Sequence, residues 1–174
     1  MPFFEEIWHV LGQSSILTSL PARPVITGAD TPVLRAKAKK VPKVTKKIQD
    51  LIRDMGETMI KADGVGLAAP QVGESLRICV APVNGKFMAL INPEITSFSK
   101  ETNIDEEGCL SLPGIYLPIE RADKITVTFM DSKGGHQERQ LEMFEARVVQ
   151  HETDHLNGVL IVDKPATKKA TKKL

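Results

Sequence analysis

The stretch "QHETDHLNG", residues 150–158, has two histidines four positions apart and a glutamate directly after the first histidine. On a helix, residues at i and i+4 share one face, so His151 and His155 can bind one metal ion. Glu152 would then lie beside that ion, where a general base is needed. The alternative is that both histidines are core residues with satisfied hydrogen bonds and no metal, but this motif on an apolar helix face favours the metal site.

The residues before the motif predict the helix itself. Phe144 and Val148 precede the two histidines at helical spacing, which predicts a helix over about residues 144–156 with both histidines on its buried stripe. Gly158 follows as its stop signal.

Two histidines do not complete a catalytic metal site, and nothing after this helix completes it. One known zinc-peptidase pattern requires a histidine at position 161, where this chain has Ile161. Another uses a downstream glutamate, and no glutamate follows Glu152; Asp163 is the one carboxylate side chain after this helix. The third ligand must therefore come from upstream. The candidates are Cys79, Cys109, His9 and His136.

Local surroundings separate these four residues. Cys79 lies in "RICVA", which is typical of a buried strand, so a small core residue is expected there. His136 follows two glycines at a predicted hairpin and should lie on the surface, while His9 belongs to the N-terminal stretch. Cys109 lies in "EEGCLSLPG", a glycine-flanked turn in which backbone can approach a metal closely. We therefore choose Cys109, since one cysteine and two histidines are an established catalytic set with a fourth position open for water.

A glycine-rich stretch, "GVGLAAPQVG" at residues 64–73, lies between a predicted helix and a predicted strand. This order is reversed relative to a dinucleotide-binding loop. Either it is a tight connection, or its small residues let backbone approach a ligand, with the Gln71 amide as donor and acceptor.

The remaining patterns indicate the fold class. Residues 45–64 predict an amphipathic helix capped by Thr45, with an apolar stripe of Ile48, Leu51, Ile52, Met55 and Met59. Asn84-Gly85 predicts a hairpin between residues 76–83 and 86–92, and "SKGG" predicts another between 124–131 and 136–143. Residues 23–43 look like an irregular arm. We therefore expect an α+β fold, with mainly antiparallel sheets around a C-terminal metal-binding helix.

Composition excludes several classes of protein. Apolar residues make up 41% and charged residues 26% of 174 residues, which is typical of one globular domain. No apolar run approaches a membrane span, and acidic residues near the N-terminus argue against a signal peptide, so a cytoplasmic location without membrane contact is expected. Two cysteines in such a chain are expected as free thiols or ligands.

Charge is distributed unevenly. The segment 164–174 contains five lysines and no acid, and we expect it to be a disordered tail. Without it the chain has 18 basic and 22 acidic residues, a balance that does not favour a specific nucleic-acid-binding surface. Residues 1–22 form a separate N-terminal leader, with Phe4, Ile7, Trp8 and Leu11 at helical spacing.

Three segments carry a family resemblance. "GVGLAAPQ", "EGCLS" and "QHETDHLNG", in that order, resemble the signature motifs of the peptide deformylases. The resemblance implies antiparallel sheets around the metal helix, with residues 23–163 as the catalytic domain. It also implies removal of the formyl group from N-formylmethionyl peptides of nascent chains.

Residue roles follow from the resemblance by motif position. It implies Cys109, His151 and His155 as ligands of one divalent metal, natively Fe²⁺, with Zn²⁺, Ni²⁺ or Co²⁺ also able to occupy the site. Glu152 would be the general acid and base, and the Gln71 amide and the Leu110 N–H the oxyanion donors. The residues that would bind substrate are Gly66 for its backbone and Val65, Phe144 and Val148 for its methionine. Some relatives continue into a C-terminal helix that docks on the ribosome, whereas the lysine-rich tail here has almost no apolar residue.

Two other functions remain open from the residues alone. An ordinary metallopeptidase is disfavoured because the downstream ligand is absent. A non-enzymatic, zinc-stabilised interaction protein would need a fourth protein ligand and has no use for Glu152 or Gln71.

Overall fold

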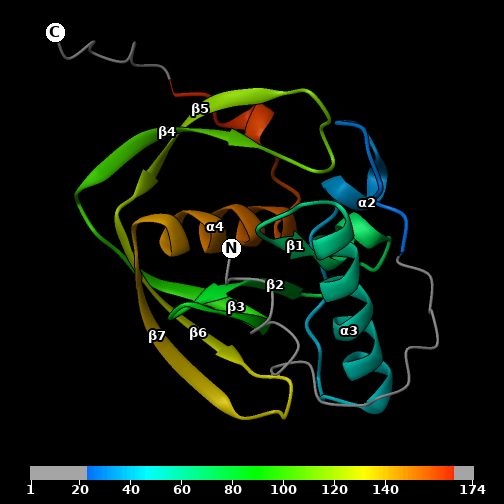
Figure 1. The fold of residues 1–174 in the computed structure, drawn as a ribbon. Helices are drawn as coiled ribbons and strands as arrows, with labels where there is room; N and C mark the ends of the chain where they lie inside the picture. Colours follow the sequence, from blue (N-terminus) through cyan, green and yellow to red (C-terminus); the bar gives the residue numbers. More distant parts are fainter. Residues whose placement is uncertain (1–22, 167–174) are drawn as a thin grey trace, which may run out of the picture.

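Helix α4 (Met143–Leu156) lies between two antiparallel sheets in the computed structural model, which describes residues 23–166 (Figure 1). The larger sheet has five strands in the order β1-β2-β3-β6-β7. The smaller sheet contains β4 and β5. The described chain is therefore an α+β protein of the expected kind, with antiparallel sheets and a C-terminal helix.

The larger sheet contains both predicted hairpins. Its strands are β1 (Leu67–Ala68), β2 (Ile78–Val83), β3 (Lys86–Phe98), β6 (Lys124–Met130) and β7 (His136–Glu142). Asn84 and Gly85, which join β2 to β3, have φ angles of 52° and 75°. Two successive positive φ angles match the twist of a two-residue hairpin, and an Asn-Gly pair adopts them readily. This local chemistry explains why the sequence predicted the turn correctly.

Helix α3 (Lys46–Lys61) covers one end of the larger sheet (Figure 1). The Thr45 side chain accepts a hydrogen bond from the Ile48 N–H at 3.4 Å, so the predicted cap is present. Leu51, Ile52, Met55 and Met59 are buried, and together with β1 and β2 they form one apolar core. The predicted stripe is confirmed, except that Ile48 is only half-buried.

A second core lies between α4 and the larger sheet. It contains Ala146, Val149 and Leu156 of the helix and Leu90 and Val127 of the sheet, among others. Cys79 is fully buried in this core, as its apolar neighbours predicted.

One expectation about α4 is wrong. Phe144 was placed on the buried stripe of the helix, but its side chain is 56% exposed. Phe144 is the second residue of α4, and its side chain lines a cavity instead of packing against a sheet.

The hairpin of β4 (Thr102–Gly108) and β5 (Tyr116–Ala122) was not predicted. Most β4 side chains are exposed, so the strand lacks the apolar alternation that marks a half-buried strand. The hairpin matters for the site because Cys109 follows β4 directly.

The ends of the described chain pack on this hairpin and on α4. The arm before α3 is irregular apart from the short helix α2 (Pro32–Arg35). After α4, the short helix η2 (Ile161–Asp163) leads to Ala166, whose N–H donates to the Pro118 carbonyl of β5 at 2.8 Å. The predicted leader 1–22 and residues 167–174 of the predicted tail lie outside the described residues. Between residues 23 and 166, no helix is long and apolar enough to cross a membrane.

Candidate active site

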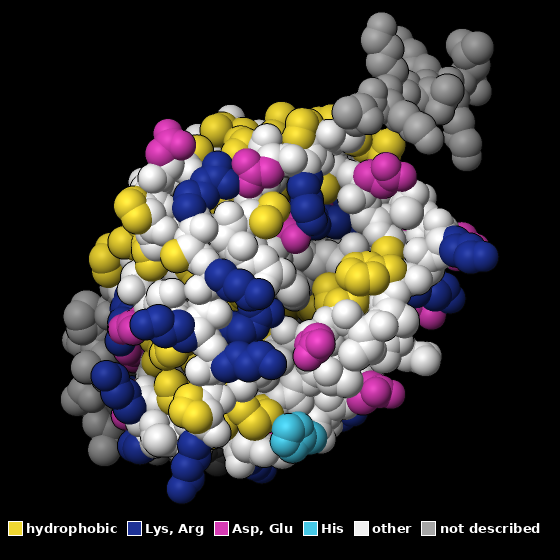
Figure 2. Space-filling model, turned by 180° about the vertical axis from the view of Figure 1, so that it is seen from behind, with side chains coloured by type: hydrophobic (Ala, Val, Ile, Leu, Met, Phe, Trp, Pro, Cys, Tyr) yellow, Lys and Arg dark blue, Asp and Glu magenta, His cyan; other side chains and the backbone are white. Residues whose placement is uncertain are grey.

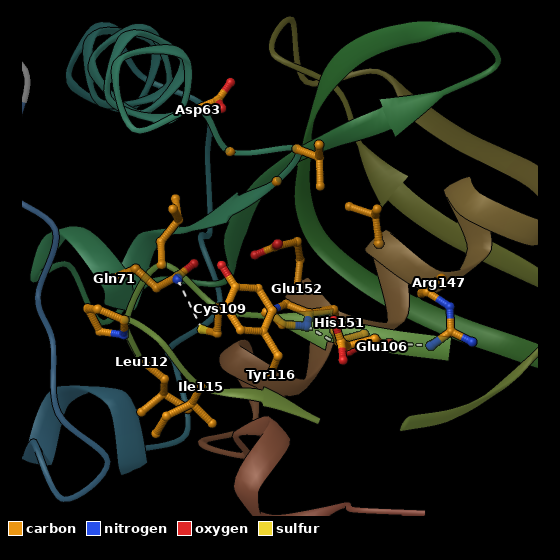
Figure 3. A pocket seen from close by; sticks show the side chains of 18 of the residues that line it. Asp63, Gln71, Glu106, Cys109, Leu112, Ile115, Tyr116, Arg147, His151 and Glu152 are labelled. Atoms are coloured by element: carbon orange, nitrogen blue, oxygen red, sulfur yellow. Dashed lines mark hydrogen bonds and ion pairs between the residues drawn. The ribbon is translucent and has the colours of Figure 1, made fainter. Parts of the chain in front are cut away.

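Three potential metal donors meet between α4 and the end of β4. His151 and His155 come from α4, and Cys109 comes from the turn after β4. Their donor atoms all lie within 4.8 Å of one another, and Cys109 Sγ lies 3.2 Å from His155 Nε2. Figure 3 shows four side chains that converge on the adjoining cavity: Gln71, Cys109, His151 and Glu152.

The donor set fits a divalent transition metal. A thiolate with two imidazoles is a known three-ligand catalytic arrangement, which leaves one position open. The His151 Nδ1 atom lies 2.9 Å from the Glu107 carboxylate. Since an ionised carboxylate can only accept, Nδ1 carries the proton and Nε2 keeps its lone pair for a metal. Glu107 therefore orients His151 so that Nε2 could serve as a ligand.

Charges around His151 stabilise a positive charge at this position. Burial lowers the pKa of His151, but its neighbours Cys109, Glu107 and Glu152 outweigh burial and raise the pKa to about 10, so a metal cation would have to displace a proton from Nε2. Burial and the positive charge of His151 hold the pKa of His155 well below its usual range. A neutral His155 is the form that can bind a metal.

Glu107 is the centre of a buried ion-pair network. Burial raises its pKa, yet hydrogen bonds from His151 and Arg121 prevail and hold the pKa well below its usual range. Arg121 donates to both oxygens of the Glu107 carboxylate at 2.9 Å, and Arg147 donates to Oε1 of the same carboxylate at 2.6 Å. Arg121 also reaches Asp154 at 2.5 Å. Sequence reasoning missed this network; the one local signal was an acid two residues before Cys109.

Glu152 lies next to the donor cluster as a buried carboxyl group. It is 4% exposed, and burial raises its pKa to about 7. Its Oε2 atom has no hydrogen-bond partner among residues 23–166. A carboxyl group with a pKa near neutrality can both accept and donate a proton, as a general acid and base must.

Two hydrogen-bond donors lie on the opposite side of Cys109 from α4. Gln71 is fixed by its own Oε1, which accepts from the Ala68 N–H at 2.8 Å in the short helix η1 (Ala69–Val72). Its Nε2 atom lies 3.2 Å from Ser111 Oγ and 3.8 Å from Cys109 Sγ. The Leu110 N–H, one residue after Cys109, makes no hydrogen bond within the described part of the chain. The Gln71 amide therefore lies beside the donor cluster, and the Leu110 N–H next to Cys109 is without a partner among the described residues.

The cavity itself has a volume of about 550 Å³. Val65, Gly66, Phe144 and Val148 belong to its lining. A Cβ atom at Gly66 would overlap the Glu152 carboxylate and would lie 2.9 Å from Val148 Cγ1. Glycine at this position therefore keeps backbone in contact with the site, which explains the glycine-rich stretch as a close approach rather than a mere connection.

All ten site residues inferred from the sequence lie in the donor cluster or line this cavity. The structure adds Ile115 and Tyr116, exposed apolar side chains at the cavity, from the unpredicted hairpin.

A His-Glu-x-x-His helix that faces a thiol across a cavity is typical of a metal-dependent hydrolase. Residues 23–171 match the model of the polypeptide deformylase family. The chain belongs to the peptide deformylase family, and it is an enzyme that removes the N-formyl group from formylmethionyl peptides of nascent proteins.

Individual relatives agree with this assignment. The peptide deformylase of Dictyoglomus thermophilum is 51% identical over 133 residues, which is 76% of this chain and 86% of the relative. That of Thermotoga maritima is also 51% identical, over 76% of this chain and 81% of the relative. The crystal structure of the Thermotoga maritima enzyme superposes with a TM-score of 0.81 at 47% identity, over 84% of this chain and 99% of that chain. A Synechococcus elongatus peptide deformylase in complex with actinonin has a TM-score of 0.82 at 37% identity, over 91% and 86%.

Proposed function

We propose that Cys109, His151 and His155 bind one divalent metal and that α4 is the metal-binding helix of this deformylase. The observation that supports this most directly is the cluster of three donor atoms beside the buried carboxyl group of Glu152. Fe²⁺ is proposed as the native ion from the family resemblance, and Zn²⁺, Ni²⁺ or Co²⁺ can take its place. Relative affinities for divalent ions would favour zinc over ferrous iron, so availability in the cell must contribute to the choice.

A divalent ion held by Cys109, His151 and His155 would lower the pKa of water and so would make hydroxide available at neutral pH. Glu152 takes up the proton at its carboxylate and returns it to the leaving amine of the peptide. Its burial suits both steps, since a pKa of about 7 makes each transfer accessible near neutrality.

The negative charge that develops on the formyl oxygen needs donors that are already in place. We assign this role to the Gln71 side-chain amide and the Leu110 N–H. Gln71 is held by Ala68 and Ser111, so it need not reorganise during the reaction. A formyl carbon bears only hydrogen, so this confined space can accept it and reject larger acyl groups.

The substrate peptide is assigned to the same cavity. Gly66 would bind its backbone, and Val65, Phe144 and Val148 would line the pocket for its methionine side chain. The 56% exposure of Phe144 is consistent with this role, because a pocket wall must remain uncovered until substrate binds.

The wider context is proposed from the same reasoning. Residues 23–163 would form the catalytic domain, preceded by the leader 1–22 and followed by the lysine-rich tail 164–174. The enzyme would work in the cytoplasm on nascent chains, without contact with membranes or specific nucleic acids. The tail would touch the ribosome only weakly, since it lacks the apolar residues of a docking helix.

A formate-release assay with the Gln71→Ala variant tests the assigned site. Loss of one oxyanion donor should raise the activation free energy by about 2.7–4 kcal/mol, mostly in kcat, with fold and metal content retained. Gln49→Ala, on the exposed side of α3, is the matched control and should behave like the parent. A change confined to KM would make Gln71 a ground-state binding residue instead. An unformylated peptide cleaved at the same rate would indicate an ordinary metallopeptidase.

A further inference from the structure

A second pocket lies on the opposite face of α4 from the candidate metal site. Its volume is about 480 Å³, and its helical lining comes from Gln150, Thr153, Asp154 and Asn157. Within each pocket the helix residues are spaced mainly by three or four positions, and the two sets fall on different faces of α4. The two pockets therefore lie on opposite sides of one helix. Figure 2 shows the face turned away from Figure 1, where Lys and Arg side chains gather around a hollow near its middle.

Unpaired cations dominate the lining of this second pocket. Lys37, Lys40 and Arg77 line it, and within residues 23–166 none of them has a carboxylate partner within salt-bridge distance. Arg121 and Lys164 also line it but are paired with Asp154. With Asp154 and Glu94 as the acids, the lining has five basic and two acidic groups. This local excess stands out because the chain before the tail has more acids than bases.

Fixed polar groups accompany the charges. The Arg77 guanidinium is held by the Leu156 carbonyl at 3.2 Å, by Asn157 Oδ1 at 2.9 Å and by the Pro93 carbonyl at 3.2 Å. The Thr153 side chain is 9% exposed, and its hydroxyl has no hydrogen-bond partner in the described part of the chain. Because this hydroxyl oxygen is itself inaccessible, the Arg77 guanidinium is the fixed polar group that we consider at this pocket.

An aromatic side chain completes the lining. Phe98, near the end of β3, is 59% exposed. An exposed ring beside phosphate-binding cations is the combination that binds nucleotides, because the base can stack on the ring while lysine or arginine contacts the phosphate.

We propose that this pocket binds a small phosphate-bearing ligand of nucleotide size, with its phosphate near Lys37, Lys40 and Arg77 and its base against Phe98. The volume lies within the usual range of ligand pockets. A single nucleotide fits the charge distribution better than a long RNA strand, since the acidic remainder of the body repels an extended polyanion.

The test is calorimetric titration of the full-length, metal-loaded enzyme with adenosine monophosphate, inorganic phosphate and a short single-stranded RNA. Adenosine monophosphate should bind saturably and more tightly than inorganic phosphate. The double variant Lys37→Gln/Lys40→Gln should weaken it roughly tenfold or more, since each lysine offers a charge-assisted hydrogen bond. Lys39→Gln, the exposed lysine between them that does not line the pocket, is the matched control and should bind like the parent. Phe98→Leu should remove the preference over inorganic phosphate.

Other outcomes overturn the proposal. These are absence of saturable binding, equal loss in the Lys39→Gln control, equal affinity for inorganic phosphate, or binding of RNA without binding of the mononucleotide. Displacement of the nucleotide by a formylated peptide would place it at the metal site and would also overturn the proposal. Deformylase activity should remain unchanged in all these variants, so failure here is distinguishable from failure of the assigned catalytic site.

Discussion

At the scale of single residues, Glu152 has a buried carboxyl group, and one of its oxygens has no hydrogen-bond partner within residues 23–166. Glu152→Gln keeps the shape of the side chain but removes the proton acceptor, so turnover should fall by roughly 10²–10⁴-fold while metal stays bound. Deformylation kinetics with metal analysis measure both effects. Glu138→Gln, on an exposed stretch of β7, should leave both unchanged. Near-normal turnover in Glu152→Gln would remove this residue from the mechanism.

The two cysteines differ in their surroundings, although both are free thiols. Burial raises the pKa of Cys79 well above its usual value, which disfavours the thiolate that a metal requires. Cys109 instead lies 3.2 Å from His155 Nε2.

Metal content of two cysteine variants tests this difference. Cys109→Ala should lose most of its metal, whereas Cys79→Ala should retain it with a modest loss of stability. Both variants should be purified side by side and analysed for metal per chain. If Cys109→Ala bound metal as tightly as the parent while Cys79→Ala did not, the proposed ligand would be wrong.

At the scale of elements, the C-terminal end of α4 depends on one glycine. Gly158 has a φ of 74°, and a Cβ atom there would overlap the Arg35 carbonyl at the end of α2. The nearby Ala38 N–H donates to the Leu156 carbonyl at 3.0 Å, so the arm and the helix end are joined by backbone contacts. A side chain at this position must therefore move the arm away from α4.

Gly158→Ala should lower the free energy of unfolding by more than the strain of a positive φ alone, which is about 1–2 kcal/mol. Gly73→Ala is the matched control, because Gly73 also has a positive φ of 85° but has open space where its Cβ would lie. Urea denaturation of both variants in the same metal state measures the difference. Equal losses would show that the contact with Arg35 has no energetic weight.

At the scale of the whole molecule, Arg121 joins the small sheet to α4. It lies on β5 and pairs with Glu107 of β4 and with Asp154 of α4, and its side chain is 3% exposed. Since Glu107 also orients His151, the network links the packing of the two layers to the geometry of the proposed metal site.

Removal of Arg121 should take two hydrogen bonds from Glu107 and one from Asp154, which leaves Glu107 with Arg147 and His151 and leaves Asp154 with Lys164. Arg121→Met should therefore lower the free energy of unfolding by about 3–5 kcal/mol, the usual effect of breaking a buried ion pair. Lys124→Gln, which breaks an exposed pair with Glu142, should cause no measurable change. Chemical denaturation of both variants tests this contrast. An Arg121→Met protein as stable as the parent would show that the network serves orientation rather than stability.

Elements with strong local signals were predictable. The Asn84-Gly85 turn, the Thr45 cap and the apolar stripe of α3 each depend on residues within one or two turns of chain. The β4–β5 hairpin was not predicted because most side chains of β4 are exposed, so its sequence lacks the alternation of apolar and polar residues that indicates a strand. Phe144 was misplaced because helical spacing gives the face of a residue but not whether that face is covered.

The sequence by itself determined the fold class and the family, because short motifs at fixed spacing carry that information. Cys109 was inferred as the third ligand from the sequence alone, because His151 and His155 have helical spacing and no residue after them fits a known ligand pattern. Only the tertiary structure decided that Glu107 bonds to His151 and is itself held by Arg121 and Arg147, and that the two pockets lie on opposite faces of α4. These contacts join residues far apart in the chain, and no local period or motif records which distant side chains will meet when the sheets pack on the helix.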